Sequence, residues 1–168
     1  MSDSSRTEPW LRGDIVDVHP LIAQVLYSLR HAEEDLELWT RGLSADRIWA
    51  RPHGLASVGF QFRHILGSID RLLTYAQGEA LSASQLEELR AESHGSEERE
   101  ILLALLSERL RDSARVLRGF DPATFTEPRT VGKKHLPTTV AGLIVHIAEH
   151  TQRHVGQAIV TAKLVKGD

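Results

Sequence analysis

Three histidines stand four residues apart near the C-terminus: His146, His150 and His154. Residues four apart lie one turn apart on the same face of a helix, so neighbouring imidazoles in this run can converge on one divalent cation. Nine histidines placed at random in 168 residues give such a triplet only about 0.03 times. The run therefore predicts a metal site on a helix. The alternative is a polar helix face whose histidines are solvated.

The apolar residues around this run indicate which of its histidines face the core. At roughly 100° per residue, His154 lies about 45° from the centre of the apolar stripe, His150 about 90° and His146 about 130°. His146 and His154 also stand about 12 Å apart along the helix axis, which is too far for one shared ion. We therefore expect His150 and His154 to form the metal-binding pair and His146 to turn toward solvent.

Two ligands do not complete a zinc site, because catalytic zinc has three protein ligands and one open position. The third ligand must come from another helix, and His64 is the best candidate because it lies inside the predicted helix of residues 58–77. It points roughly 135° from the mean of its own apolar stripe, which suits either the wall of a surface cleft or an exposed histidine. His53 and His135 could line the mouth of a pocket. Five histidines are more simply explained as solvated or as hydrogen-bonded within the protein: His19, His31, His53, His94 and His135.

Helical spacing of apolar residues predicts the elements that must position these side chains. Ser84 and Glu87 form a capping-box pattern for a short extra helix that ends near Glu92. Residues 119–137 contain three prolines and no helical period, so they predict a long loop before the last helix, with a short strand pair as the alternative. A turn is expected over residues 43–52. Four long amphipathic segments predict an all-α four-helix bundle: residues 18–41, 58–77, 96–118 and 138–165.

Length and composition indicate one folded domain. Hydrophobic residues make up 41% of the chain and charged residues 26%, as in ordinary globular proteins. We expect a flexible N-terminus over residues 1–12 and a single domain over residues 13–168. The net charge of −3, without a basic stripe, argues against a nucleic-acid partner.

The absence of cysteine excludes disulfides, thiolate ligands and a cysteine nucleophile. The N-terminus does not pair a basic start with an apolar run, and no stretch approaches 18 apolar residues. We therefore expect a cytoplasmic protein that does not enter a membrane.

Two stretches of the sequence resemble the DinB-like superfamily, also called the DinB/YfiT-like metalloenzymes. Residues 57–66, SVGFQFRHIL, are similar to the family's second helix with its single ligand histidine. Residues 146–157, HIAEHTQRHVGQ, are similar to the family's last-helix pattern H-x3-H-x3-H-R-G-Q. The order of the helices and the long third connection also fit, so the resemblance extends from about His19 to Val165. Val155 stands where many relatives have arginine, so no role of that guanidinium carries over.

The resemblance implies a metal triad of His64, His150 and His154. His146, Gln157 and Arg71 would then line the pocket beside the ion, and Gly156 would permit close approach of a neighbouring helix. The implied metal is zinc or nickel, with iron or manganese as alternatives.

The function implied by the resemblance is that of a divalent-metal-dependent enzyme acting on a small-molecule substrate. Some relatives are thiol-dependent transferases or isomerases that use a low-molecular-weight thiol such as bacillithiol or mycothiol. A chain without cysteine agrees with such a borrowed thiol but does not require one. The alternatives are a metal-binding bundle with a structural, sensory or partner-binding role, and a member that has lost its activity.

Two further expectations concern binding surfaces. Arg63, Arg71 and Arg153 are candidate anion-binding groups near the site, although exposed arginines of this kind are more often simply solvated. An apolar helix face left over from bundle packing would permit a homodimer. Its candidate contacts are the three tryptophans, for which burial in the core is the alternative: Trp10, Trp39 and Trp49.

Overall fold

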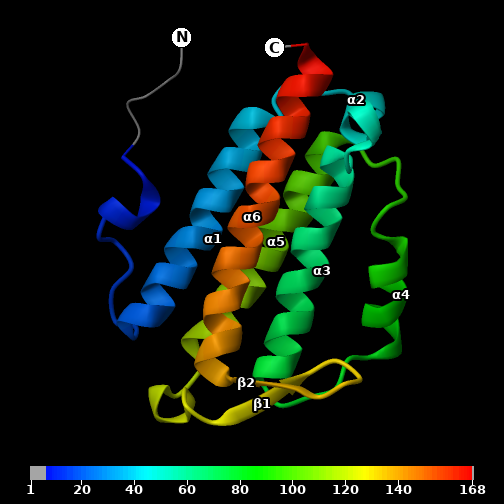
Figure 1. The fold of residues 1–168 in the computed structure, drawn as a ribbon. Helices are drawn as coiled ribbons and strands as arrows, with labels where there is room; N and C mark the ends of the chain where they lie inside the picture. Colours follow the sequence, from blue (N-terminus) through cyan, green and yellow to red (C-terminus); the bar gives the residue numbers. More distant parts are fainter. Residues whose placement is uncertain (1–6, 168) are drawn as a thin grey trace.

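The structure is a computed structural model that describes residues 7–167. Four long helices run side by side as a bundle (Figure 1), and this confirms the all-α four-helix prediction. They are α1 (Pro20–Trp39), α3 (Val58–Ala76), α5 (Arg99–Arg118) and α6 (Val140–Lys166). Two shorter helices, α2 (Ala45–Trp49) and α4 (Ala83–Ala91), and a hairpin of β1 (Pro128–Val131) with β2 (Leu136–Thr139) join them.

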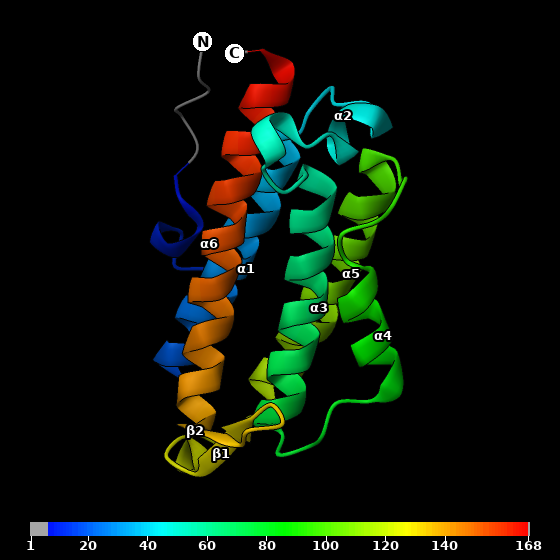
Figure 2. The ribbon, with the colours of Figure 1, turned by 45° about the vertical axis from the view of Figure 1, so that its right-hand side comes forward.

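The apolar stripes of the long helices meet in one core. Phe62, Ile65 and Ile69 of α3 are fully buried, as are Ile144 and Ile147 of α6. These side chains recur at three- and four-residue intervals, so each helix turns one continuous face inward. As a result α3 and α6 lie next to each other along most of their length (Figures 1 and 2).

The ends of the helices differ from the predicted ends by a few residues, for local reasons. The first helix begins at Pro20, with the ring of His19 accepting a hydrogen bond from the Leu21 amide. The capping box of α4 is formed by Ser82 and Gln85, so the prediction of Ser84 and Glu87 was wrong by two residues. Ser82 and Gln85 fit the capping-box pattern as well as Ser84 and Glu87 do, because Gln can replace Glu at the third helical position.

The segment before α5 stays extended, so this helix begins at Arg99 and not at residue 96. The indole of Trp49 donates a hydrogen bond to the carbonyl of Glu97 (3.1 Å) and lies against Gly95. This contact holds the chain away from the helical path. Trp49 belongs to α2, a helix of five residues in the predicted turn, which buries Ile48.

The long connection folds into the strand pair that was the alternative to an irregular loop. Pro128 pairs with Thr139 and Val131 with Leu136 in an antiparallel register. The turn between the strands includes two residues of positive φ, Gly132 and His135. The hairpin crosses the end of the bundle where α6 begins (Figure 1), and Thr139 caps that helix by accepting from the Gly142 amide.

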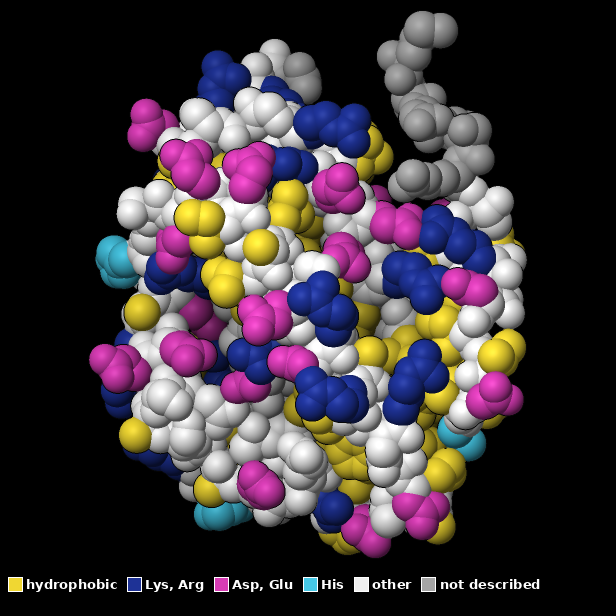
Figure 3. Space-filling model, turned by 180° about the vertical axis from the view of Figure 1, so that it is seen from behind, with side chains coloured by type: hydrophobic (Ala, Val, Ile, Leu, Met, Phe, Trp, Pro, Cys, Tyr) yellow, Lys and Arg dark blue, Asp and Glu magenta, His cyan; other side chains and the backbone are white. Residues whose placement is uncertain are grey.

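Residues 1–6 of the expected flexible N-terminus lie outside the described residues, while Pro9–Leu11 form a 3₁₀ turn. On the rear face, acidic and basic side chains are interspersed, and no continuous basic stripe crosses it (Figure 3). None of the helices between residues 7 and 167 has both the length and the apolar character of a membrane span.

Candidate metal centre

The structure brings three of the singled-out histidines together, one from α3 and two from α6. The Nε2 atoms of His64 and His150 are 3.0 Å apart. The ring of His154 lies 4.2 Å from the ring of His64 and 4.5 Å from that of His150, measured between centroids. One nitrogen from each ring can be chosen so that all three lie within 4.8 Å of one another.

Local sequence explains how each ring reaches this point. His150 and His154 are one turn apart on the face of α6 that lies toward α3. On α3, Ser57 caps the helix by accepting from the Phe60 amide (3.0 Å). The ring of Phe60, one turn before His64, stacks on the imidazole at 5.3 Å with an interplanar angle of 14°. The cap and the stacked ring together limit the orientations open to His64.

The outer nitrogens of two of the rings contact protein acceptors. His64 Nδ1 lies 2.7 Å from Glu92 Oε2, and His154 Nδ1 lies 2.7 Å from Gln61 Oε1. A proton on Nδ1 that is donated to these oxygens leaves the Nε2 lone pair of each ring for a metal ion. The Nδ1 atom of His150 is buried and has no hydrogen-bond partner among the described residues, so no protein acceptor holds a proton on that nitrogen.

Burial changes the acid–base properties of the two histidines on α6. Desolvation is the main reason that the pKa of His150 and the pKa of His154 fall from 6.5 to about 4. The neighbouring His64 and Arg153 lower both pKa values further. Both rings are therefore neutral at pH 7, and a neutral imidazole is the form that binds a metal ion.

The donor set fits a divalent ion of the zinc type. A tetrahedral ion with zinc–nitrogen bonds of about 2.0–2.1 Å holds its ligand nitrogens about 3.3 Å apart. The 3.0 Å between His64 Nε2 and His150 Nε2 is within a few tenths of an ångström of that spacing. Imidazole nitrogen also suits nickel and iron, so the geometry agrees with more than one metal.

The other residues expected near the site differ in how closely they approach it. His146 has 42% of its side chain exposed, and its ring centroid is 5.3 Å from that of His150, outside the group of three. Gln157 accepts a hydrogen bond from Gln61 (3.1 Å), so it contacts the site through that residue. Gly156 is exposed with no side chain within 4 Å, so the expected close helix approach is wrong.

The three candidate arginines all have protein partners. Arg71 is only 8% exposed, and its Nη2 lies 2.8 Å from Glu92 Oε1, so it reaches the site through a carboxylate. Arg63 pairs with Glu97. Arg153 remains exposed and lies 3.4 Å from Glu149, which leaves it the most accessible of the three to an anion.

Sequence reasoning missed two residues that contact the rings, Gln61 and Glu92. Gln61 is 1% exposed and stands three residues before His64, a spacing that places the two residues on adjacent parts of one helix and could have pointed to it. Glu92 follows a separate short helix, 28 residues after His64. Neither periodicity nor a motif connects those two positions, so only the fold reveals the contact.

The remaining histidines and tryptophans lie elsewhere. None of the five other histidines belongs to the group of three within residues 7–167. The indole of Trp49 donates a hydrogen bond to the carbonyl of Glu97. The ring of Trp39 lies 4.4 Å from the Lys163 ammonium. Trp10 is 53% exposed.

Comparisons with known proteins show which family the chain belongs to. A family model described as the DinB superfamily matches residues 28–158, a range that includes all three histidines. The crystal structure of a conserved protein from Enterococcus faecalis superposes with a TM-score of 0.61 at 19% identity, covering 86% of this chain and 96% of that one. At this identity the likeness shows the fold alone. A search of curated proteins finds no match.

Proposed function

The chain belongs to the DinB superfamily, and from that premise we propose that it is a divalent-metal-dependent enzyme whose ion is held by His64, His150 and His154. The observation that carries the proposal is the convergence of three ring nitrogens, from two different helices, within 4.8 Å. Zinc or nickel is the proposed metal, with iron or manganese as alternatives. Imidazole ligands suit zinc, nickel and iron, whereas manganese prefers oxygen ligands.

An enzyme is favoured over a structural metal site by the number of ligands. Within residues 7–167 the group contains three residues and no fourth. Structural zinc sites are closed by four protein ligands, whereas catalytic sites have three and leave a position for an incoming molecule. When bound, such an ion would lower the pKa of a water or thiol, or polarise a carbonyl group.

We further propose that the reaction is a thiol-dependent transfer or isomerisation with a low-molecular-weight thiol such as bacillithiol or mycothiol. The chain has no cysteine, so a thiolate in the site would have to come from a small molecule. The exposed side chains of Arg153 and His146 flank the triad on α6. They supply polar groups that could contact the anionic part of such a thiol or of its substrate.

Metal content is the first test. Protein purified without a histidine tag should contain close to one divalent ion per chain by mass spectrometry. His150→Ala should lose that metal and keep the helical circular dichroism, because the ring contributes to the site and not to the apolar core. His146→Ala is the matched control, since it removes the same side chain one turn away, and it should keep the metal. Unchanged metal content in His150→Ala would contradict the proposed triad.

Catalysis is the second test, and it separates the enzyme from a structural or sensory metal site. The metal-loaded protein should accelerate transfer of a thiol to a model electrophile, and His150→Ala should not. A protein that binds metal tightly but gives no rate with bacillithiol, mycothiol or simpler thiols would favour the structural or sensory role.

A further inference from the structure

The short helix α4 lies along the bundle without burying a side chain of its own (Figure 2). Leu89, its most apolar outward residue, is 41% exposed. Surface helices are normally held by an apolar stripe, and α4 has none. In the whole segment of residues 77–98, Glu92 is the one residue that is buried. The segment must therefore be held by polar contacts.

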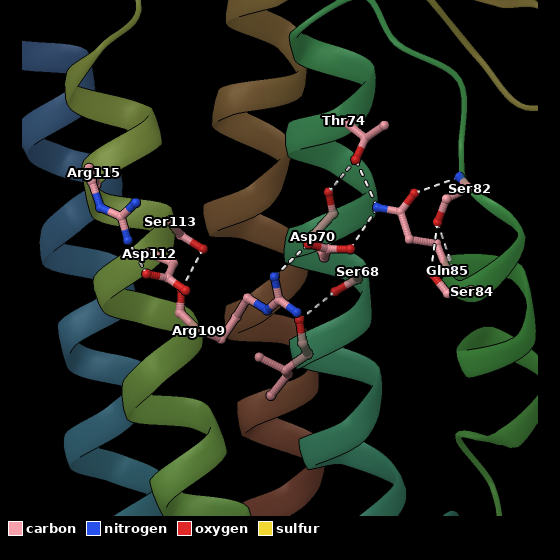
Figure 4. A network of polar contacts seen from close by, with 11 residues as sticks. Ser68, Asp70, Thr74, Ser82, Ser84, Gln85, Arg109, Asp112, Ser113 and Arg115 are labelled. Carbon is pink, nitrogen blue, oxygen red and sulfur yellow. Dashed lines mark hydrogen bonds and ion pairs between the residues drawn. The ribbon is translucent and has the colours of Figure 1, made fainter.

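One set of polar contacts anchors the beginning of α4 (Figure 4). Gln85 Nε2 donates to Asp70 Oδ2 (2.6 Å) and to Thr74 Oγ1 (2.8 Å), both on α3. The other oxygen of Asp70 pairs with Arg109 of α5. Gln85 also accepts from the Ser82 amide (2.9 Å), which completes the capping box. The first turn of α4 is thus fixed directly to α3 and, through Asp70, to α5.

A second set of contacts anchors the chain on either side of Glu92. Arg63 of α3 donates to the carbonyl of Ala91 (3.1 Å) and to that of His94. The same guanidinium pairs with Glu97. One half-buried arginine therefore holds the backbone both before and after Glu92.

The side chain placed by these anchors is a carboxylate. Glu92 is 4% exposed, with Oε2 at 2.7 Å from His64 Nδ1 and Oε1 at 2.8 Å from Arg71 Nη2. A side chain at Gly67 would collide with it, since a Cβ there would lie 2.7 Å from Glu92 Oε1. Burying a carboxylate costs free energy unless it is paired, and no apolar packing of α4 offsets that cost. Stability alone gives no reason for Glu92 to be buried.

We propose that Glu92 is a positioning residue for the metal centre and that α4 serves to deliver it. By accepting a hydrogen bond from His64 Nδ1–H, the carboxylate keeps the proton on that nitrogen and turns the Nε2 lone pair toward His150 and His154. Carboxylate partners of this kind also increase the basicity of a ligand histidine. Arg71 forms an ion pair with the second oxygen, although that oxygen accepts no hydrogen bond from the described residues. This inference rests on the proposed function, because the role of Glu92 is defined by the ion.

The test compares Glu92→Gln with Glu88→Gln in the full-length protein. Both glutamates line the same cavity of about 530 Å³ between α3, α4 and α5, but Glu88 is exposed, whereas the carboxylate that contacts His64 is that of Glu92. Loss of the charged partner should weaken zinc affinity by about 10- to 100-fold in Glu92→Gln, measured by competition with a chelator. Glu88→Gln should bind zinc as the wild type does. Equal affinity of Glu92→Gln and wild type would overturn the proposal.

The tautomer of His64 is an independent readout that needs neither metal nor a variant. In the metal-free wild type, long-range ¹H–¹⁵N spectra of the imidazole should show the proton on Nδ1. In Glu92→Gln the amide can instead donate to Nδ1, so the population with the proton on Nε2 should rise. A wild-type His64 protonated on Nε2 alone would overturn the proposal even if Glu92→Gln failed to fold.

A third variant separates delivery of the carboxylate from its charge. Gln85→Ala keeps Glu92 but removes the anchor to Asp70 and Thr74, and it should weaken zinc binding less than Glu92→Gln does. A wild type that binds no metal would refute the proposed function, whereas the His64 tautomer would still decide whether Glu92 holds the proton on Nδ1. A wild type that binds metal with Glu92→Gln indistinguishable from it would refute this inference alone.

Discussion

At the scale of single residues, the candidate centre depends on which nitrogen of each ring carries a proton. Glu92 and Gln61 accept from the outer nitrogens of His64 and His154, whereas the outer nitrogen of His150 has no acceptor among the described residues. Two of the three rings are therefore oriented before any ion arrives. Such preorientation lowers the entropic cost of ordering the ligands when the metal binds.

The first residue-scale prediction concerns Gln61. Gln61→Leu keeps most of the buried volume but removes the acceptor for His154 Nδ1, so zinc affinity should fall about 10- to 100-fold. Gln157→Ala is the control, because it removes only the exposed partner of Gln61 and should change affinity little. Chelator competition measures both. An equal loss in the two variants would mean that the contact with His154 is not what matters.

The second residue-scale prediction concerns the stability of the metal-free protein against pH. The pKa of His150 and the pKa of His154 are about 4 in the folded chain and about 6.5 when unfolded. Between these values the unfolded chain binds more protons than the folded one, so acidification from pH 6.5 to pH 4 should lower the melting temperature. His154→Asn should reduce this slope, as followed by circular dichroism. A slope identical to that of the wild type would contradict the assignment.

At the scale of elements, the indole of Trp49 packs against two glycines of different segments. A Cβ at Gly59 of α3 would lie 2.7 Å from the Trp49 indole, and a Cβ at Gly95 would lie 2.4 Å from carbons Cη2 and Cζ2 of the same indole. The indole has no room to move away from either. Trp49 thereby connects α2, α3 and the segment that precedes α5.

The element-scale prediction follows from this confined ring. Gly59→Ala should destabilise the protein by about 1–3 kcal/mol through overpacking, measured by denaturant unfolding. Gly156→Ala is the matched control, since that glycine is also inside a helix but has open space around it. There the substitution should stabilise by about 0.5–1 kcal/mol, because alanine favours the helix. A neutral Gly59→Ala would contradict the confinement of the indole.

The elements also show what sequence alone could and could not predict. Apolar periodicity is a local signal, so the four long helices and the inward face of α6 were predictable, as was the pairing of His150 with His154. The contact of Glu92 with His64 joins a short helix without an apolar stripe to a site 28 residues away, and no local pattern encodes it. The sequence favoured an irregular loop over the hairpin because the two strands are only four residues long and contain prolines.

At the scale of the whole molecule, membership of the DinB superfamily and the bundle fold are established, while assembly stays a prediction. The homodimer that we expect would use apolar surface left on the outside of the bundle. Val160 and Leu164 of α6 are 55% and 41% exposed, and Trp10 is 53% exposed. Sedimentation of the purified protein tests this, with a mass near 37 kDa expected from two chains of 18.7 kDa each.

The polar attachment of α4 has a kinetic consequence. Since none of residues 83–91 is buried, this helix can detach while the four long helices stay folded, in a local opening of low free energy. Its backbone amides should exchange with deuterium sooner than those of α3, and raised salt should speed that exchange by weakening the ion pairs. Each opening would also withdraw the Glu92 oxygen from His64, so the residence time of the ion should shorten with it.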